Sequence, residues 1–258
     1  MRLRVLGAHN LESLHTRCVS LLINDVIALD AGSITSSLTF EQQARLKVVF
    51  LSHSHYDHVK DVPALALNLF RQSASVCILC SAEVRATMVE CMLNGDLYPR
   101  LHERPAAAPT IRFREAVAGT EESVGHHRLR PLPVAHAKET LGVEVSDQSG
   151  TTLLYTADTG PLPEGFWAET SPRMLVIETT APSRYAEMVQ PAGHLTPSML
   201  EVELVRFRAA NGFVPRVLTV HADPLIGTRQ ELCDELAAVS ARTGADIQVA
   251  YEGLELDI

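Results

Sequence analysis

Ser52-His53-Ser54-His55-Tyr56-Asp57-His58 is the most informative segment of this sequence, and it directly follows a short apolar segment, Val48–Leu51. Three histidines and one aspartate fall close together at the end of a predicted strand, where a loop can direct them to one place. Imidazole nitrogens and carboxylate oxygens are standard zinc ligands. A polar surface loop is the alternative, but so dense a cluster has few structural uses other than metal binding. The segment therefore predicts a metal site, with His53 and His55 on one side and Asp57 and His58 turned toward a second site.

Three further candidate ligands, His136, Asp158 and His221, each follow the end of a predicted strand. In layered folds, functional sites are assembled at strand ends. Taken singly, His136 also suits a buried core position and Asp158 also suits a turn cap, but the first cluster requires further ligands. We therefore predict that one metal ion binds His53, His55 and His136, that a second binds Asp57, His58 and His221, and that Asp158 bridges the two.

Short apolar segments alternate with helical patterns along the whole chain. Leu3–Leu6, Val19–Ile23 and Val26–Leu29 are predicted to form an opening antiparallel set of strands, and Ile247–Ala250 with Leu254–Ile258 a closing pair. Several neighbouring strands have connections too short for helical crossovers, which disfavours a doubly wound parallel sheet. The order favours an α/β (α+β) fold of two mixed sheets packed face to face with helices outside.

The remaining predicted elements follow the same periodicity argument. Cys77 and Cys80 fall in one of these strands and are expected to point to opposite faces as small buried residues. The strands are Lys47–Leu51, Val76–Leu79, Arg130–Ala135, Leu141–Ser146, Thr151–Thr156, Met174–Ile177 and Arg216–Val220, and the helices are Val62–Phe70, Ala82–Met92, Pro197–Ala209 and Arg229–Arg242.

Composition limits the classes of protein to which this chain can belong. No Pro-rich stretch is long enough for an interdomain linker, so we expect a single domain over residues 1–258. Because the chain is 46% hydrophobic, it can bury a core without disulfides, and its five irregularly spaced cysteines do not suggest a disulfide framework. The formal charge of −9 opposes a broad electrostatic grip on nucleic acid, which is therefore not an expected partner.

The sequence also lacks the patterns that direct a chain to a membrane. It contains no signal-peptide pattern at its start and no apolar run long enough to span a bilayer. We therefore expect a cytoplasmic protein without a membrane partner. The oligomeric state stays open, with a homodimer among the options.

Several motifs resemble those of a known family. The segment His53–His58 resembles the HxHxDH signature of the metallo-β-lactamase superfamily, and the order of His136, Asp158 and His221 extends the likeness over nearly the whole chain. Asp30-Ala31-Gly32, after a predicted strand, is similar to the opening motif of that superfamily. The resemblance implies a four-layer αββα sandwich with the metals at one edge of the two sheets.

Within that superfamily, the chain looks most like the phosphodiesterase branch. Gly193-His194-Leu195-Thr196-Pro197 is similar to the GHxxP-type motif of class II cyclic nucleotide phosphodiesterases and to a histidine motif of tRNase Z. Asn94–Pro99, Asp158–Pro161 and Ile177-Glu178 also resemble the phosphodiesterase class. The resemblance implies two divalent metal ions, with zinc favoured over manganese or iron, and hydrolysis of a small phosphodiester such as a 3′,5′-cyclic nucleotide.

Three residues are expected to assist this chemistry. By resemblance, His194 binds a phosphoryl oxygen or protonates the leaving oxygen, although a supporting or capping role is the alternative. Asp57 is expected to be a metal ligand that also accepts a hydrogen bond from the nucleophilic water. Glu178 is expected either to orient His194 or a ligand histidine, or to be a plain carboxylate at a strand end. Asp30 is a weaker candidate for supporting the ligand loop.

Departures from the family patterns keep three other functions open. The tRNase Z enzymes carry a long arm between the positions matching His136 and Asp158, where this chain has only residues 137–157, which is 21 positions. A tRNase Z-like ribonuclease is therefore a weaker alternative, beside a glyoxalase II-like thiolester or other ester hydrolase and a diiron redox protein of the same fold. The loops around residues 93–109 and 162–172 are expected to shape the pocket.

Overall fold

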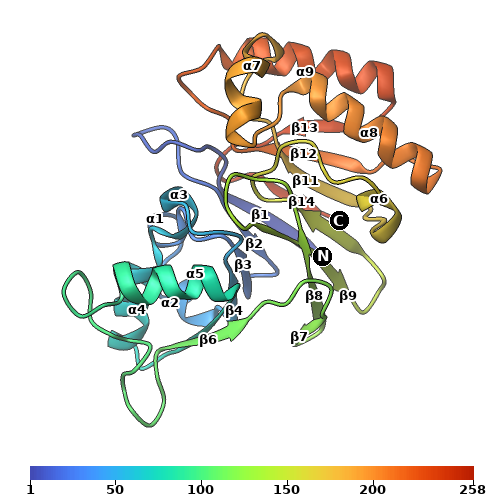
Figure 1. Ribbon diagram of the computed structural model, residues 1–258. Coiled ribbons are helices and arrows are strands. Elements are labelled where there is room, and N and C mark those ends of the chain that lie inside the picture. Colours follow the sequence, from blue (N-terminus) through green and yellow to red (C-terminus); the bar gives the residue numbers. More distant parts are fainter.

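The computed structural model describes residues 1–258 and contains two sheets of seven strands each, packed face to face (Figure 1). Helices cover the outer face of each sheet, so the molecule has the four layers of an αββα sandwich. The expectation of two mixed sheets with helices outside is confirmed. No helix has the length and hydrophobicity that crossing a lipid bilayer would require.

The first sheet has the strand order β14-β1-β2-β3-β4-β5-β6. β1, β2 and β3 pair in antiparallel fashion, as expected, whereas β3 to β6 run parallel. Its strands are β1 (Arg2–Gly7), β2 (Ser20–Ile23), β3 (Ile27–Leu29), β4 (Val48–Phe50), β5 (Val76–Cys80), β6 (Ile111–Glu115) and β14 (Glu255–Asp257).

The second sheet has the order β13-β12-β11-β10-β9-β8-β7. Its β10 to β13 run parallel, and β7 to β10 form an antiparallel meander. Its strands are β7 (Glu122–Val124), β8 (His127–Pro133), β9 (Leu141–Asp147), β10 (Thr152–Tyr155), β11 (Met174–Glu178), β12 (Arg216–Val220) and β13 (Ile247–Val249).

The helices divide between the two outer faces (Figure 1). α1 to α5 lie over the first sheet, whereas α6, α8 and α9 cover the second. Their bounds are α1 (Ile34–Ser37), α2 (Phe40–Arg45), α3 (Tyr56–Val59), α4 (Val62–Arg71), α5 (Ala82–Thr87), α6 (Phe166–Glu169), α7 (Ala186–Val189), α8 (Pro197–Asn211) and α9 (Arg229–Thr243).

Three apolar clusters hold the layers together. A cluster of 26 buried residues fills the space between the sheets, and clusters of 22 and 16 lie between each sheet and its helices. Successive strand residues point to opposite faces, so each sheet contributes to two clusters. Cys77 packs against the central cluster and Cys80 lies in the outer one, so the two point to opposite faces as predicted, although only Cys80 is fully buried and Cys77 is partly buried.

The predicted closing pair of strands is wrong. β13 pairs with β12 in the second sheet, whereas β14 pairs with β1 in the first. The turn between them crosses from one sheet to the other, because Gly253 N donates to Val5 O and Val5 N donates to Leu254 O. Each strand therefore extends a different sheet. Two apolar segments that are adjacent in sequence do not pair as a hairpin when each pairs with the edge strand of a different sheet.

Several elements were not predicted from the sequence. β6 is mostly exposed and β7 has only three residues, of which one is apolar, so the periodicity of both is weak. The predicted helix Ala82–Met92 begins as α5 but continues as a π-helical turn over Met88–Met92. The last part of the segment His53–His58 lies in the short helix α3, which turns Asp57 and His58 relative to His53 and His55.

The sheet topology collects the candidate site residues at one edge. Parallel strands end at the same edge of a sheet, and this edge is formed by the ends of β3 and β4 in one sheet and β10 to β12 in the other. Five candidate residues lie at or just after these ends: Asp30, His53, Asp158, Glu178 and His221. His136 joins them from the segment after β8.

Candidate metal centre

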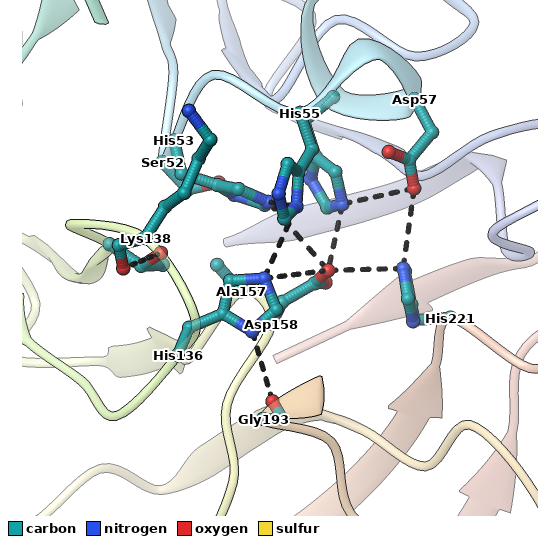
Figure 2. Close-up of polar contacts among 12 residues, drawn as sticks. Ser52, His53, His55, Asp57, His136, Lys138, Ala157, Asp158, Gly193 and His221 are labelled. Carbon is teal, nitrogen blue, oxygen red and sulfur yellow. Dashed lines mark hydrogen bonds and ion pairs between the residues drawn. The ribbon is translucent and has the colours of Figure 1, made fainter. Parts of the chain in front are cut away.

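The first predicted ligand group meets at one point. His53 Nε2 lies 2.9 Å from His55 Nδ1, which lies 3.2 Å from His136 Nε2. Asp158 Oδ2 is 3.7 Å from His53 Nε2 and 3.9 Å from His136 Nε2. Figure 2 shows these side chains converging, His53 and His55 from the loop after β4, His136 from the segment after β8 and Asp158 from the segment after β10. Together they form a group that can hold a metal ion.

The second predicted group lies on the other side of Asp158. His221 Nε2 is 3.2 Å from Asp158 Oδ2 and 3.3 Å from Asp57 Oδ2. His58 Nε2 is 3.2 Å from Asp158 Oδ1 and 3.4 Å from Asp57 Oδ2. These four residues also form a group that can hold a metal ion. Asp158 therefore belongs to both groups, one carboxylate oxygen facing His58 and the other facing the remaining histidines.

The geometry and the unpaired atoms of the site fit metal ions. Ligand atoms on a tetrahedral zinc ion lie roughly 3.3 Å apart, given zinc–nitrogen distances of about 2.0–2.1 Å. The separations of 2.9–3.4 Å among neighbouring ligand atoms are close to this value. His58 Nε2 and Asp158 Oδ1 are buried without a hydrogen-bond partner. Because unpaired buried polar atoms are costly, two of them facing one point suit a bound cation.

Asp30 supports the ligands of the first sheet from behind. Its Oδ2 accepts hydrogen bonds from His58 Nδ1 at 2.7 Å, Ser52 Oγ at 2.8 Å and Tyr155 Oη at 2.7 Å, and its Oδ1 accepts one from Ser52 N at 2.8 Å. Ser52 Oγ also lies 2.9 Å from His53 Nδ1. Asp30 is fully buried, so these bonds are formed away from water and hold His58 and His53 in place.

His194 lies beside the second group and is held by Glu178. His194 Nδ1 donates to Glu178 Oε1 at 2.7 Å, and Glu178 is fully buried. Its carboxylate also accepts from Thr159 N, Thr180 Oγ1 and Leu195 N. Because Nδ1 is engaged, Nε2 is the nitrogen of His194 that is free to contact another molecule. Glu178 was expected either to orient a histidine or to be a plain carboxylate at a strand end, and the structure places it in contact with His194.

Comparison with known proteins identifies the family of this chain. The model of the "Beta-lactamase superfamily domain" matches residues 24–222, which include every candidate ligand. The chain belongs to the metallo-β-lactamase superfamily. No curated protein is close enough in sequence to match it.

Solved structures of the same fold span the whole chain. The metallo-β-lactamase fold protein YhfI from Bacillus subtilis has a TM-score of 0.77 and 18% identity, covering 99% of this chain and 98% of its own. Unliganded yeast PDE1 has a TM-score of 0.86 at 15% identity, covering 100% and 99%. Human tRNase Z, short form, has a TM-score of 0.71 at 16% identity, also covering 100% and 99%. At these identities the likeness shows the shared superfamily fold.

The carboxylates of this superfamily site are strongly acidic. Burial opposes ionisation of Asp57, but its interactions with the imidazoles of His221 and His58 outweigh burial and hold its pKa below the usual range. Burial also opposes ionisation of Asp158, where the charges of His221 and His58 lower the pKa. Burial lowers the pKa of His53 as well. Ionised carboxylates and a neutral imidazole are the forms that bind metals.

The opposite shift applies to His194. Burial disfavours its protonated form, but the hydrogen bond to Glu178 and the negative charge of that carboxylate outweigh burial and raise the pKa of His194. A histidine with a raised pKa keeps its second proton to higher pH than an ordinary histidine and can act as an acid.

Three of the six non-glycine residues with a positive φ lie at this edge of the sheets. Asp30, Ala157 and His221 adopt positive φ angles of 58°, 55° and 64°. These values are uncommon for residues other than glycine and are often found at functional sites. Gly193 also has a positive φ of 82°, and a Cβ there would lie 2.9 Å from His136 Nδ1. Its carbonyl instead accepts a hydrogen bond from His136 Nδ1 at 3.0 Å (Figure 2).

A cavity of about 440 Å³ opens over the two groups. Five candidate site residues line it, together with residues 10–12, Cys18, Tyr56 and Lys60. Neither the loop 93–109 nor the loop 162–172 contributes to it, so the prediction that they shape the pocket is wrong. Both are anchored elsewhere: Leu93 and Leu101 pack in the outer cluster of the first sheet, and Leu162 and Trp167 pack against α8.

Several supporting residues of the site were not predicted from the sequence. Ser52, Tyr155 and Thr180 contact site residues, yet each is one polar residue in or beside an apolar strand. Ser52 directly precedes the ligand segment, which is a usable signal. Nothing local marks Tyr155 or residues 10–12, because they reach the site only when the two sheets pack together.

Proposed function

We propose that this chain is a binuclear metal-dependent phosphodiester hydrolase that acts on a small nucleotide-like substrate, such as a 3′,5′-cyclic nucleotide. The observation that carries the proposal is the position of His194, a histidine with one free nitrogen beside two ligand groups that share Asp158. Likeness to yeast PDE1 and human tRNase Z adds support. A nitrogen- and oxygen-rich ligand set suits zinc.

Two bound divalent cations would lower the pKa of a water molecule and polarise a phosphoryl group placed between them. The residues of the chain would then divide the remaining work. His53, His55 and His136 would hold one ion, Asp57, His58 and His221 the other, and Asp158 both. His194 would hold a proton on Nε2 for a phosphoryl oxygen or the leaving oxygen, while Glu178 stabilises its protonated form.

The size and charge of the pocket favour a small substrate. A volume of about 440 Å³ falls within the range of small-molecule pockets, about 300–1,000 Å³. Lys60, the one lysine or arginine of the lining, is paired with Glu12 at 3.1 Å and Asp61 at 2.9 Å. With the charge of Lys60 compensated, the lining has no unpaired lysine or arginine to bind a chain of phosphates, which argues against a tRNase Z-like substrate.

The test of this proposal is His194→Ala in protein whose metal content has been measured. We expect metal content near two ions per chain, as in the unaltered protein, while turnover of bis(p-nitrophenyl) phosphate falls by roughly 10²–10⁴-fold. Loss of metal from this variant would make His194 a ligand and contradict the assignment. A panel of cyclic nucleotides, linear phosphodiesters, pre-tRNA and a glutathione thiolester then identifies the substrate, and preferred hydrolysis of the thiolester would contradict phosphodiester hydrolysis.

A further inference from the structure

Glu178 reaches a metal-ligand candidate as well as His194, through one hydroxyl group. Thr180 Oγ1 donates to Glu178 Oε2 at 2.7 Å, and the same oxygen lies 3.0 Å from His221 Nδ1. Thr180 and Glu178 are buried, with exposures of 3% and 0%, so water does not compete for these bonds. One carboxylate thus contacts two imidazoles, His194 directly and His221 through Thr180.

The single proton of the threonine hydroxyl determines the direction of this chain of bonds. An ionised carboxylate only accepts hydrogen bonds, so Thr180 must donate its proton to Glu178. The oxygen of Thr180 is then an acceptor for His221, which must carry its proton on Nδ1. His221 Nε2 is left with its lone pair directed at Asp57 and Asp158, as metal binding requires.

The same arrangement occurs at the end of the other sheet. Asp30 contacts His58 directly and contacts His53 through Ser52, with distances of 2.7, 2.8 and 2.9 Å along the chain of bonds. A carboxylate, a hydroxyl and two imidazoles therefore recur at β3 and β11. Repetition at two unrelated sequence positions indicates that the hydroxyl has a role beyond filling space.

We propose that Thr180 is a positioning residue that fixes the tautomer and orientation of His221 and thereby makes Glu178 the common support of a metal ligand and of His194. The inference rests on the proposed metal centre but not on the identity of the substrate. It also explains why Glu178 is so completely hydrogen-bonded, since its carboxylate must stay in one position to hold two side chains at once.

The chain offers a matched control at the neighbouring position. Thr179 is fully buried, and its Oγ1 has no hydrogen-bond partner. Thr179→Val and Thr180→Val are the same chemical change, made one residue apart at the same strand end. Because removing an unpaired hydroxyl is nearly neutral, only Thr180→Val should affect the site.

The decisive measurement is zinc affinity by competition with a chelator. In Thr180→Val we expect the affinity for one of two ions to fall by about 10–100-fold, the range for losing a partner of a metal-ligating histidine. Thr180→Ser, which keeps the hydroxyl, should restore it, and Thr179→Val should match the unaltered protein. Equal affinity in Thr180→Val and Thr179→Val would overturn the inference, even if turnover also fell.

Nitrogen NMR of the histidine rings in metal-free protein gives a second readout that needs no substrate. We expect His221 to be protonated on Nδ1 in the unaltered protein and in Thr180→Ser, and to show a mixture of tautomers in Thr180→Val. An unchanged tautomer in Thr180→Val would overturn the inference. A protein that binds two zinc ions and responds to Thr180→Val, yet hydrolyses no phosphodiester, would refute the proposed function while supporting the role of Thr180.

Discussion

The end of β3 and the end of β11 each carry a fully buried carboxylate, Asp30 and Glu178, but the groups around them differ. Asp30 contacts only groups inside the molecule, including Tyr155 from the opposite sheet. Glu178 contacts His194, whose side chain is 17% exposed and lines the cavity. Asp30 therefore faces the interior of the centre, and Glu178 connects the centre to the cavity.

This difference separates two tasks that a hydrolytic centre needs. Asp30 supports two histidines, one from each ligand group: His53, through Ser52, and His58 directly. Asp30 therefore acts on both candidate metal positions. Glu178 acts on one of them, through His221, and on the candidate acid. Changes at Asp30 should therefore appear mainly in metal binding, and changes at Glu178 mainly in turnover.

The largest effect is expected at Asp158, the residue that the two ligand groups share. Asp158 belongs to both ligand groups and is 3% exposed at its side chain. Asp158→Ala should remove both metal ions together and abolish hydrolysis, as measured by elemental analysis and assay of the same sample. Retention of one ion at full occupancy would show that Asp158 serves only one side.

A paired comparison of Asp30→Asn and Glu178→Gln separates the two tasks. Asp30→Asn replaces an acceptor of three side-chain bonds, so we expect affinity for both ions to fall by about 10–100-fold, measured by chelator competition. Glu178→Gln should leave the ion held by His53, His55 and His136 unaffected and should lower kcat more than metal content. Identical effects of the two variants on both quantities would remove the distinction.

The smallest expected effect is a shift in the pH dependence of turnover. Glu178 raises the pKa of His194 against the effect of burial, so the protonated form persists above the usual histidine value of about 6.5 and is lost as pH rises further. If His194 is the acid, kcat should fall on the alkaline side. In Glu178→Gln this fall should move to lower pH, because the charge that favours protonation is gone. An alkaline limb that does not move would show that another group controls it.

Much of the fold followed from local patterns in the sequence. The apolar strands, the helices α4, α8 and α9, and the two-sheet arrangement were predicted from periodicity and connection length, and the superfamily from the motif His53–His58. The errors occurred where pairing is decided over long distances. β13 and β14 are adjacent in sequence but complete different sheets, which no local pattern reveals.

For the candidate site, the sequence by itself determined which residue types are present and their order, because ligand chemistry is a property of each side chain. Only the tertiary structure decided which atoms face one another. It turns Nδ1 of His55, and Nε2 of His53, His136 and His221, toward the two ligand groups. It also places Ser52, Tyr155 and Thr180 behind the ligand residues. These relationships depend on strand order, on register and on the packing of two sheets. They arise from burial of the whole core rather than from any single segment.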